Sequence, residues 1–342
     1  MEKFRDCYHN QRPATPAPRN YHNRLPATPN PGCCHNRLLD KKRFVEFLKK
    51  TIGNRERKRV FVQIPEGLKP ELFEIVDAVE SLGHECVISL EPCYGACDVR
   101  DYEASLLNSD VVLHIGHKKF YRDFPTSIPV IYYPLPIDVE IDGNEIGKIK
   151  ESKIGLLTTV QHEHQLKEIA ELLKSLGKEP VIGGSILGCD TRAAKKIENL
   201  VDCFLFIGSG RFHATGIETE KPVYLYDVER RKICAVERER KERINLARME
   251  MLRDSKIVLF LISTKKGQLP QPGTVQQLKE KLEQLGKKVY LVALDEVKND
   301  KLLGIKADFL VNFACPRLSE DKFDLPVLNA RYVLERVEKL KT

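Results

Sequence analysis

Short apolar runs alternate along this chain with longer segments in which apolar residues recur at helical spacing. The short runs are rich in β-branched and aromatic residues, which is typical of buried strands. The longer segments predict amphipathic helices, one of which stops at Gly83. Strands separated by helices favour parallel βαβ units. In the first part of the chain the expected strands are Arg59–Ile64, Cys86–Leu90, Val111–Ile115 and Val130–Tyr133, and the expected helices are Lys41–Lys50 and Pro70–Leu82.

This order of elements occurs three times. Each copy has a first strand that opens on a basic residue, a helix that ends in Leu-Gly, an aspartate before the third strand and a proline before the fourth. Landmarks that recur in order indicate three homologous α/β units of roughly a hundred residues each. We expect these parallel-sheet βα units to surround a central site with pseudo-threefold symmetry. The landmarks are Arg59, Lys153 and Lys256; Gly83, Gly177 and Gly286; Asp110, Asp202 and Asp308; and Pro129, Pro222 and Pro326.

The three expected units span residues 39–150, 151–254 and 255–342. The second ends in a charged stretch, Val228–Asp254, which we expect to form a helix that joins it to the third. Residues 1–38 have a different composition, because they hold six of the 19 prolines and few apolar residues. Such a segment cannot bury enough apolar surface to order itself, so we expect a disordered tail.

Composition and charge narrow the class of protein. The 342 residues are 42% hydrophobic and 31% charged, as in a globular protein. Of the net charge of +7, residues 1–38 contribute +4, so the remainder is nearly neutral and we expect no direct binding to nucleic acid. We expect no membrane span and no signal peptide. Ten cysteines then indicate a reducing compartment, and we expect the cytoplasm.

Three cysteines follow predicted strands, one in each unit. Cys97 follows the second strand of unit one, Cys189 has the same place in unit two, and Cys315 follows the third strand of unit three. Open α/β sheets bind ligands at the C-terminal ends of parallel strands, so three units could direct three thiolates at one centre. Three sulfur ligands suit an iron–sulfur cluster with one open iron, or zinc with a fourth ligand. Three buried structural cysteines are the alternative.

Other polar groups lie at the same strand ends. A Gly-Ser-Gly turn in unit two could bring backbone N–H groups close to an anion, although a plain tight turn has the same sequence. A Gln-His-x-His segment enters a helix of that unit and could position a ligand, move protons or form local hydrogen bonds. The candidate ligand-binding residues are therefore Gly208, Ser209, Gly210, His213, Gln161, His162 and His164.

One position is polar in all three units but differs in kind. Seven residues after the aspartate landmark stand His117 in unit one, Ser209 in unit two and Cys315 in unit three. A different polar group in each copy favours one shared central site over three independent turns. His114 lies three residues before His117. Cys93 lies four residues before Cys97, and a single pair of cysteines at this spacing is weak evidence for metal binding.

Eight short motifs run in order through the units: Gln63-x-Pro65-Glu-Gly-Leu68, Tyr94-Gly-Ala-Cys-Asp98, His114-x-Gly-His117, Gln161-His-x-His-Gln-Leu166, Leu187-Gly-Cys189, Gly208-Ser-Gly-x-Phe-His213, Lys265-Lys-Gly-Gln-Leu269 and Ala314-Cys-Pro-Arg317. Together they resemble the archaeal diphthamide-biosynthesis enzymes, the 2-(3-amino-3-carboxypropyl)histidine synthases. The resemblance runs from about Asp40 to the C-terminus and leaves residues 1–38 outside. Cys93 is not part of the family motif and receives no ligand role from it.

The resemblance implies that Cys97, Cys189 and Cys315 each ligate one iron of a [4Fe–4S] cluster, with the fourth iron facing S-adenosylmethionine. It implies reductive cleavage to methylthioadenosine and a 3-amino-3-carboxypropyl radical. That radical would add to C2 of a histidine imidazole on translation elongation factor 2, the first step of diphthamide synthesis. An electron donor and a homodimer are also implied. The CxxxCxxC loop of common radical S-adenosylmethionine enzymes is lacking in the family, and the three matching cysteines here are dispersed.

Two other classes share parts of this outline. Quinolinate synthase is also a three-unit α/β protein with one cluster cysteine per unit, but it is a dehydrating condensation enzyme that needs no S-adenosylmethionine. The Gly-Ser-Gly-x-Phe-His and Gln-His-x-His-Gln-Leu motifs argue against it. A zinc-stabilised scaffold subunit is a non-enzymatic alternative. The identity of the bound metal separates these classes.

Overall fold

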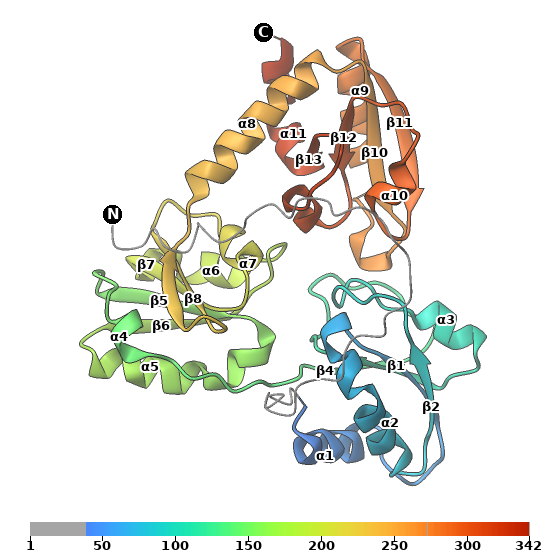
Figure 1. Cartoon of the computed structure of the whole chain (residues 1–342), viewed down its shortest axis with the longest axis vertical. Coiled ribbons are helices and arrows are strands. Elements are labelled where there is room, and N and C mark those ends of the chain that lie inside the picture. Colours follow the sequence, from blue (N-terminus) through green and yellow to red (C-terminus); the bar gives the residue numbers. More distant parts are fainter. Residues whose placement is uncertain (1–38, 272, 342) are drawn as a thin grey trace, which may run out of the picture.

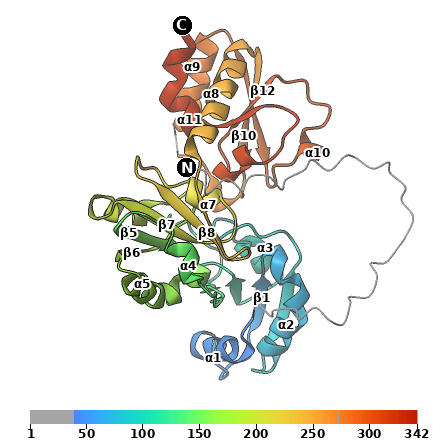
Figure 2. The same cartoon turned by 60° about the vertical axis from the view of Figure 1, so that its left-hand side comes forward.

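The computed structural model describes residues 39–271 and 273–341, and the expected tail at 1–38 lies outside them. The described residues form three sheets, one in each expected unit (Figure 1). In Figure 1 the first unit is blue to teal, the second green to yellow and the third orange to red. Turning the molecule by 60° keeps the three units distinct, with the third above the other two (Figure 2).

All three sheets share one strand order, in which the first strand is central. The orders are β2-β1-β3-β4, β6-β5-β7-β8-β9 and β11-β10-β12-β13. The neighbours are parallel except for β9, which is antiparallel to β8. Parallel strands end at one edge, where such sheets bind ligands. The strands are β1 Arg59–Gln63, β2 Glu85–Ser89, β3 Val111–Ile115, β4 Val130–Tyr133, β5 Lys153–Thr158, β6 Glu179–Ser185, β7 Cys203–Gly208, β8 Val223–Asp227, β9 Lys232–Ala235, β10 Ile257–Ser263, β11 Lys288–Leu294, β12 Phe309–Asn312 and β13 Val327–Asn329.

Each sheet has an apolar core on both faces. In β1, Val60 and Val62 pack in one cluster and Phe61 in another, because successive side chains of a strand point to opposite faces. The second and third sheets likewise carry two clusters each. The helices are α1 Lys41–Thr51, η2 Glu66–Glu71, α2 Leu72–Glu80, α3 Asp101–Leu106, α4 Gly143–Ile146, η3 Val160–Gln165, α5 Leu166–Ser175, α6 Arg192–Ile197, η4 Glu198–Leu200, α7 Phe212–Thr215, α8 Arg238–Asp254, η5 Lys266–Gln268, α9 Thr274–Gln284, α10 Asn299–Leu302, η6 Pro316–Glu320, α11 Ala330–Arg336 and η7 Val337–Lys341, where η denotes a 3₁₀ helix.

The repeated aspartates have one structural task in all three units. Each stands before the third strand and accepts a hydrogen bond from a backbone N–H at the start of the neighbouring first strand. The carboxylate thereby ties the two strands together where their backbone ladder begins. The bonds run from the N–H of Arg59 to Asp110 (2.7 Å), of Lys153 to Asp202 (3.0 Å), and of Lys256 and Ile257 to Asp308 (2.9 and 2.7 Å).

The repeated Leu-Gly pairs end helices as the sequence predicts. Gly83, Gly177 and Gly286 have φ values of +85°, +75° and +79°, the left-handed conformation that favours glycine after a helix. The next residue in each unit hydrogen-bonds to a backbone carbonyl in the segment before the first strand, which fixes the second strand beside it. These pairs are His84 with Gly53 (2.8 Å), Lys178 with Ile149 (2.7 Å) and Lys287 with Arg253 (2.8 Å).

The expected helix over Val228–Asp254 is wrong in its first third. Residues Lys232–Ala235 form β9, which extends the second sheet by pairing with β8. Ile233 and Cys234 are buried there, and this burial outweighs the charge pattern that suggested a helix. The helix α8 begins at Arg238 and runs from the second unit to the third in Figure 1.

The unit boundaries at 150 and 254 stay predictions. At each boundary, apolar residues that precede it are buried in the core of the unit that follows. Ile146 of α4 and the nearby Ile149 are buried in the core of the second unit. Met249 and Leu252 of α8 are buried in the core of the third. Within the described residues, no helix combines the length and the apolar composition that crossing a bilayer requires.

Candidate metal centre

Three thiols, one from each unit, lie within electrostatic range of one another. Cys97 lies in the loop between β2 and α3, Cys189 follows β6, and Cys315 stands between β12 and η6. Burial raises the pKa of Cys189 to about 12, and the charges of Cys315 and Cys97 add to that rise. Burial also raises the pKa of Cys315 to about 11, again with a contribution from Cys97. The fold therefore brings together the three cysteines that the sequence places on different units.

The three sulfur atoms do not form a close group in this structure. In the described part of the chain, Cys97, Cys189 and Cys315 are not a group whose sulfurs all lie within 4.8 Å of one another. A tetrahedral zinc ion about 2.3 Å from each sulfur would hold them roughly 3.8 Å apart. A four-iron cluster binds each thiolate to a different iron and spreads the sulfurs. The donor set fits a cluster better than a single zinc ion.

Cys97 is held in place by the third unit. The backbone N–H of Gly267 donates to the Cys97 carbonyl (3.1 Å), and Gln268 Nε2 donates to the Cys97 sulfur (3.4 Å). Burial raises the pKa of the Cys97 thiol, and the Gln268 hydrogen bond opposes that rise. A Cβ atom on residue 267 would lie 2.5 Å from the Cys97 Cα, so only glycine fits. Arg122 of the first unit donates to the Gly267 carbonyl (2.9 Å) and completes the clamp.

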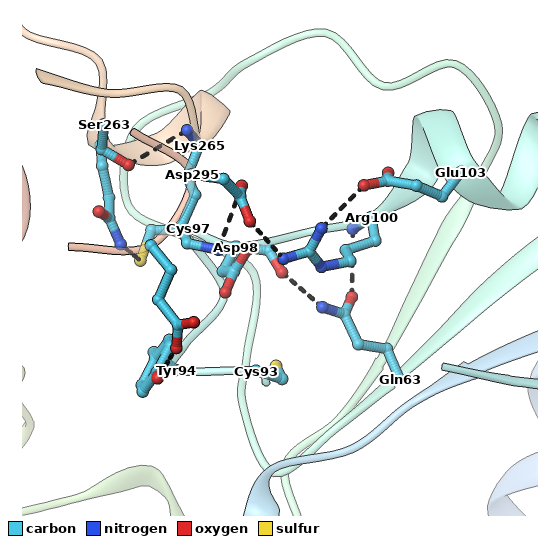
Figure 3. A network of polar contacts seen from close by, with 12 residues as sticks. Gln63, Cys93, Tyr94, Cys97, Asp98, Arg100, Glu103, Ser263, Lys265 and Asp295 are labelled. Atoms are coloured by element: carbon cyan, nitrogen blue, oxygen red, sulfur yellow. Dashed lines mark hydrogen bonds and ion pairs between the residues drawn. The ribbon is translucent and has the colours of Figure 1, made fainter. Parts of the chain in front are cut away.

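A buried ion-pair network continues from this loop into the third unit (Figure 3). Lys265 donates to Asp98 at 2.7 Å, and their side chains are only 5% and 3% exposed. Arg100 pairs with Asp295 at 2.9 Å. Burial raises the pKa of the Asp98 carboxyl, and the Lys265 ammonium opposes that rise. Two adjacent ion pairs thus join the first and third units beside Cys97. The third unit supplies the cation of one pair and the first unit supplies the cation of the other.

The third unit uses the end of its second strand differently from the other two. Where units one and two carry Cys97 and Cys189, unit three has Asp295 and Glu296 after β11. Asp295 receives Arg100, and Glu296 accepts a hydrogen bond from the Tyr94 hydroxyl. These two carboxylates bind the loop of the first unit that carries Cys97. The third unit therefore uses the end of its second strand to hold a cysteine loop and has no cysteine of its own there.

Cys189 is positioned by a histidine from the next loop of its own unit. His213 Nδ1 accepts a hydrogen bond from the backbone N–H of Gly188 (2.9 Å). A Cβ on residue 188 would lie 2.4 Å from the Phe212 ring, so the loops meet without a side chain between them. Burial lowers the pKa of His213, and Arg317 lowers it further. His213 therefore lies within electrostatic range of the residues beside Cys315.

Cys315 is held by an asparagine at the end of β12. Asn312 Nδ2 donates to the Cys315 carbonyl (2.8 Å), and Asn312 Oδ1 accepts from the N–H of Ala314 (2.9 Å). Asn312 also donates to Asn329 Oδ1 (2.7 Å) on the next strand. This side chain is 2% exposed and has both its donor and its acceptor satisfied, so the loop has little freedom.

A comparison with protein families shows the family of this chain. A family model described as a putative diphthamide synthesis protein matches residues 64–333. This chain belongs to the diphthamide synthesis family. It is 35% identical to the 2-(3-amino-3-carboxypropyl)histidine synthase of Pyrococcus horikoshii over 81% of this chain and 84% of that protein. It is 30% identical to subunit 1 of the Candida glabrata synthase over 80% of this chain and 68% of that protein.

Solved structures give the same result for the fold of this diphthamide synthesis protein. The crystal structure of Pyrococcus horikoshii Dph2 with a 4Fe-4S cluster matches with a TM-score of 0.77 and 33% identity, over 88% of this chain and 91% of that one. A second crystal structure of Pyrococcus horikoshii Dph2 matches with a TM-score of 0.76. The resemblance inferred from the eight motifs is confirmed, and so is the α/β architecture of three similar units.

The polar residues at the start of the helical segment after β5 bind the first unit and the linker that follows it. Gln161, His162 and His164 all direct a ring or amide nitrogen at the segment between β3 and α4. Their predicted contact with a ligand is not among these bonds and stays a prediction. Their partners, in order, are the carbonyl oxygens of Gly116 (2.6 Å) and Ile137 (2.9 Å) and the carboxylate of Asp138 (2.6 Å).

The Gly-Ser-Gly turn lies at the C-terminal end of β7, on the chain segment that leads to His213. Gly208 is buried as the last residue of the strand, whereas Ser209 and Gly210 are exposed. Gly210 has a φ of +70°, and a Cβ there would meet no atom within 4 Å. The turn is therefore open, with a backbone conformation that favours glycine, and it can admit an anionic group.

A cavity beside Cys189 adds residues that the sequence did not single out. Its volume is about 500 Å³, and all three units contribute to its wall. Tyr121 stacks against the guanidinium of Arg192 (5.1 Å), and the Cys189 charge contributes to the raised pKa of its hydroxyl, after burial. Contacts of this kind join residues far apart in the sequence and leave no local pattern. The residues from the three units are Tyr121 and Arg122; Cys189, Asp190 and Arg192; and Arg331.

Proposed function

We propose that this chain transfers a 3-amino-3-carboxypropyl group from S-adenosylmethionine to C2 of a histidine imidazole on translation elongation factor 2. This is the first step of diphthamide synthesis. One observation supports the proposal above the others: three half-buried thiols, one per unit, interact at one centre with a spacing wider than a single ion needs. The Pyrococcus horikoshii relative that carries the synthase name has a described structure with a 4Fe-4S cluster.

Cys97, Cys189 and Cys315 would hold the [4Fe–4S] cluster and leave its fourth iron open to S-adenosylmethionine. When bound, the cluster supplies the electron that cleaves the sulfonium at its aminocarboxypropyl carbon. The protein's own residues hold the ligand side chains in position. Gln268 and Gly267 fix the Cys97 loop, so that the thiol needs little rearrangement on binding iron.

The Gly-Ser-Gly turn would bind the carboxylate of the methionine part of the substrate. The backbone N–H groups of Gly208, Ser209 and Gly210 are the candidate donors, two of them on residues without a side chain, and turns of this kind bind anions. His213 lies beside this turn and near Cys189 through its bond to Gly188. Gln161, His162 and His164 would support the site from the linker side, through their bonds to the 116–138 segment.

The proposed reaction requires partners. An electron donor would supply the reducing equivalent, and elongation factor 2 would present its histidine at the cavity beside Cys189. We propose that the protein acts as a homodimer in the cytoplasm, without direct binding to nucleic acid. The cavity is lined by one arginine from each unit, and two of them are paired with carboxylates of the same wall, Arg192 with Asp190 and Arg331 with Glu218.

The test is the nucleoside that anaerobically reconstituted protein releases from S-adenosylmethionine with dithionite. Methylthioadenosine is the expected product, and Cys97→Ser, Cys189→Ser and Cys315→Ser should each abolish it. Cys86→Ser is the matched control, because Cys86 is a half-buried thiol on β2 of the first unit. It should leave both the iron content and the product unchanged.

Three other outcomes would contradict the proposal. Deoxyadenosine would mean that a different bond of the sulfonium is broken. No cleavage by protein that holds four irons and four sulfides would favour a dehydratase of the quinolinate synthase type. Zinc without iron or sulfide would favour the scaffold subunit.

A further inference from the structure

A second group of metal-ligand side chains lies in the first unit, separate from the three cysteines. Cys93, His114 and His117 place one ligand atom each within 4.8 Å of the other two. His114 Nε2 is 3.0 Å from His117 Nδ1 and 3.9 Å from Cys93 Sγ. Cys93 is 4% exposed and His114 is fully buried. Figure 3 shows Cys93 well apart from the Cys97 thiol on their shared loop.

The hydrogen bonds around Gln63 fix which nitrogen of His114 carries the proton. Gln63 Nε2 donates to the Asp98 carbonyl (2.6 Å), which can only accept. Gln63 Oε1 accepts from the backbone N–H of Arg100 (3.2 Å), which can only donate. The amide orientation is therefore determined from both ends, and Oε1 must also accept from His114 Nδ1 (3.1 Å). His114 thus has its proton on Nδ1 and directs the lone pair of Nε2 at Cys93 and His117.

This is the arrangement that a histidine ligand of a metal ion needs. The ring nitrogen opposite the metal donates to a fixed acceptor, which sets the tautomer and the ring orientation. A tetrahedral ion about 2.0–2.1 Å from nitrogen and about 2.3 Å from sulfur holds its ligand atoms roughly 3.3–3.6 Å apart. The nitrogen–nitrogen separation of 3.0 Å and the sulfur–nitrogen separation of 3.9 Å each lie within about 0.4 Å of these values. The group therefore fits one ion, whereas the three cluster cysteines do not.

We propose that Cys93, His114 and His117 bind a single divalent transition-metal ion, with zinc as the ion that one thiolate and two imidazoles favour. Binding removes the proton of the Cys93 thiol, which leaves to solvent, and the site keeps a net charge of +1. The Asp98 carboxylate and its partner Lys265 both lie within electrostatic range of Cys93, with opposite effects on it. The fourth position is open to water. This site does not depend on the proposed transferase activity.

The test uses the full chain with Cys97, Cys189 and Cys315 all changed to Ser, so that no cluster can form. Zinc by elemental analysis and cobalt(II) titration followed by absorption are the measurements. We expect one equivalent of metal and a thiolate-to-cobalt charge-transfer band. Adding Cys93→Ser should remove the band, and adding His117→Gln should weaken binding at least about tenfold.

Two control variants, made in the chain that lacks Cys97, Cys189 and Cys315, test whether other cysteines bind the metal. Cys33→Ser with Cys34→Ser, and separately Cys86→Ser, should leave the stoichiometry and the band unchanged. His117 is only half-buried, so His117→Gln keeps a folded chain if Cys93→Ser does not. Circular dichroism verifies the fold of each variant.

The proposal fails if the folded cluster-free chain binds no stoichiometric zinc or cobalt. In that case His117 simply donates a hydrogen bond to His114. It fails equally if binding survives both Cys93→Ser and His117→Gln. In the chain with its cluster thiols intact, Cys93→Ser should leave four irons and four sulfides in place, and a loss of iron there would instead assign Cys93 to the cluster.

Discussion

The backbone N–H of Gly267 donates to the carbonyl of Cys97 across the interface between the third and first units, at 3.1 Å. No other residue type fits at 267, because a Cβ would lie 2.5 Å from the Cys97 Cα and 2.6 Å from its Cβ. The position of one thiol of the candidate centre is therefore set by a residue 170 positions away in the sequence. This contact leads to the first prediction.

Gly267→Ala should displace the Cys97 loop and lower the iron content of reconstituted protein. Overpacking of this kind costs about 1–3 kcal/mol, so the chain should still fold while the thiol moves. Iron and sulfide analysis with a thermal unfolding curve is the measurement. Gly67→Ala is the matched control, because a Cβ there meets no atom within 4 Å. Full cluster content in Gly267→Ala would show that the loop tolerates the shift.

Lys265→Met should destabilise the protein strongly, because it leaves Asp98 buried without its partner. Breaking a buried pair costs about 3–5 kcal/mol, and removing both charges costs less. The double variant Lys265→Met with Asp98→Leu should therefore recover part of the loss in urea unfolding. The exposed pair of Lys119 and Asp123, with side chains 72% and 84% exposed, provides the control. Lys119→Met should cost no more than about 1 kcal/mol; an equal cost at both sites would contradict the argument.

His162 should make the protein less stable in mild acid. Its side chain is 6% exposed, and burial lowers its pKa below the value of about 6.5 that it has in the unfolded chain. The folded state therefore binds fewer protons, so the contribution is full above pH 6.5 and is lost as the pH falls toward the lowered pKa. The slope is at most about 1.4 kcal/mol per pH unit.

His162→Asn isolates this contribution from the other buried histidines. The asparagine amide can still donate to the Ile137 carbonyl but does not titrate. Unfolding midpoints between pH 6.5 and pH 5 should fall less steeply for the variant than for the natural chain. Parallel curves would mean that His162 does not account for the acid sensitivity.

Gly210→Asp should weaken binding of S-adenosylmethionine at least about tenfold, which corresponds to 1.4 kcal/mol. The new carboxylate would repel the substrate carboxylate at the Gly-Ser-Gly turn. Isothermal titration of the reconstituted protein is the measurement. Gly210→Ala is the control, since it has the same unfavourable φ of +70° without the charge. If affinity is unchanged in Gly210→Asp, the turn does not bind the carboxylate; if both variants lose it equally, backbone conformation is the cause.

Most of the fold could be predicted from local features of the sequence. The aspartates Asp110, Asp202 and Asp308 recur because each closes the same pair of strands, so the repeat was visible before the bonds were known. The strand Lys232–Ala235 was not predicted, because its two buried residues are surrounded by charges. Tertiary pairing with β8 decides its conformation, and no local pattern encodes that.

The candidate site likewise contains residues that local sequence could predict and residues that only tertiary contacts reveal. Cys97, Cys189 and Cys315 could be selected because each follows a strand of a repeated unit. The roles of Gly267 and Gln268 could not, because they depend on the third unit docking beside the first. The group of Cys93 and His114 was hidden for a similar reason. Its fit to a metal depends on the orientation of one amide, that of Gln63.

Because each unit contributes one thiol, the order of synthesis limits when the centre can form. A growing chain has Cys97 and Cys189 long before Cys315, which lies 126 residues after Cys189. A centre with three ligands can therefore be filled only after Cys315 has been synthesised and the third unit has docked. Once filled, it would cross-link the three units at a point where the described contacts are hydrogen bonds and ion pairs, and its loss would remove the one connection that all three share.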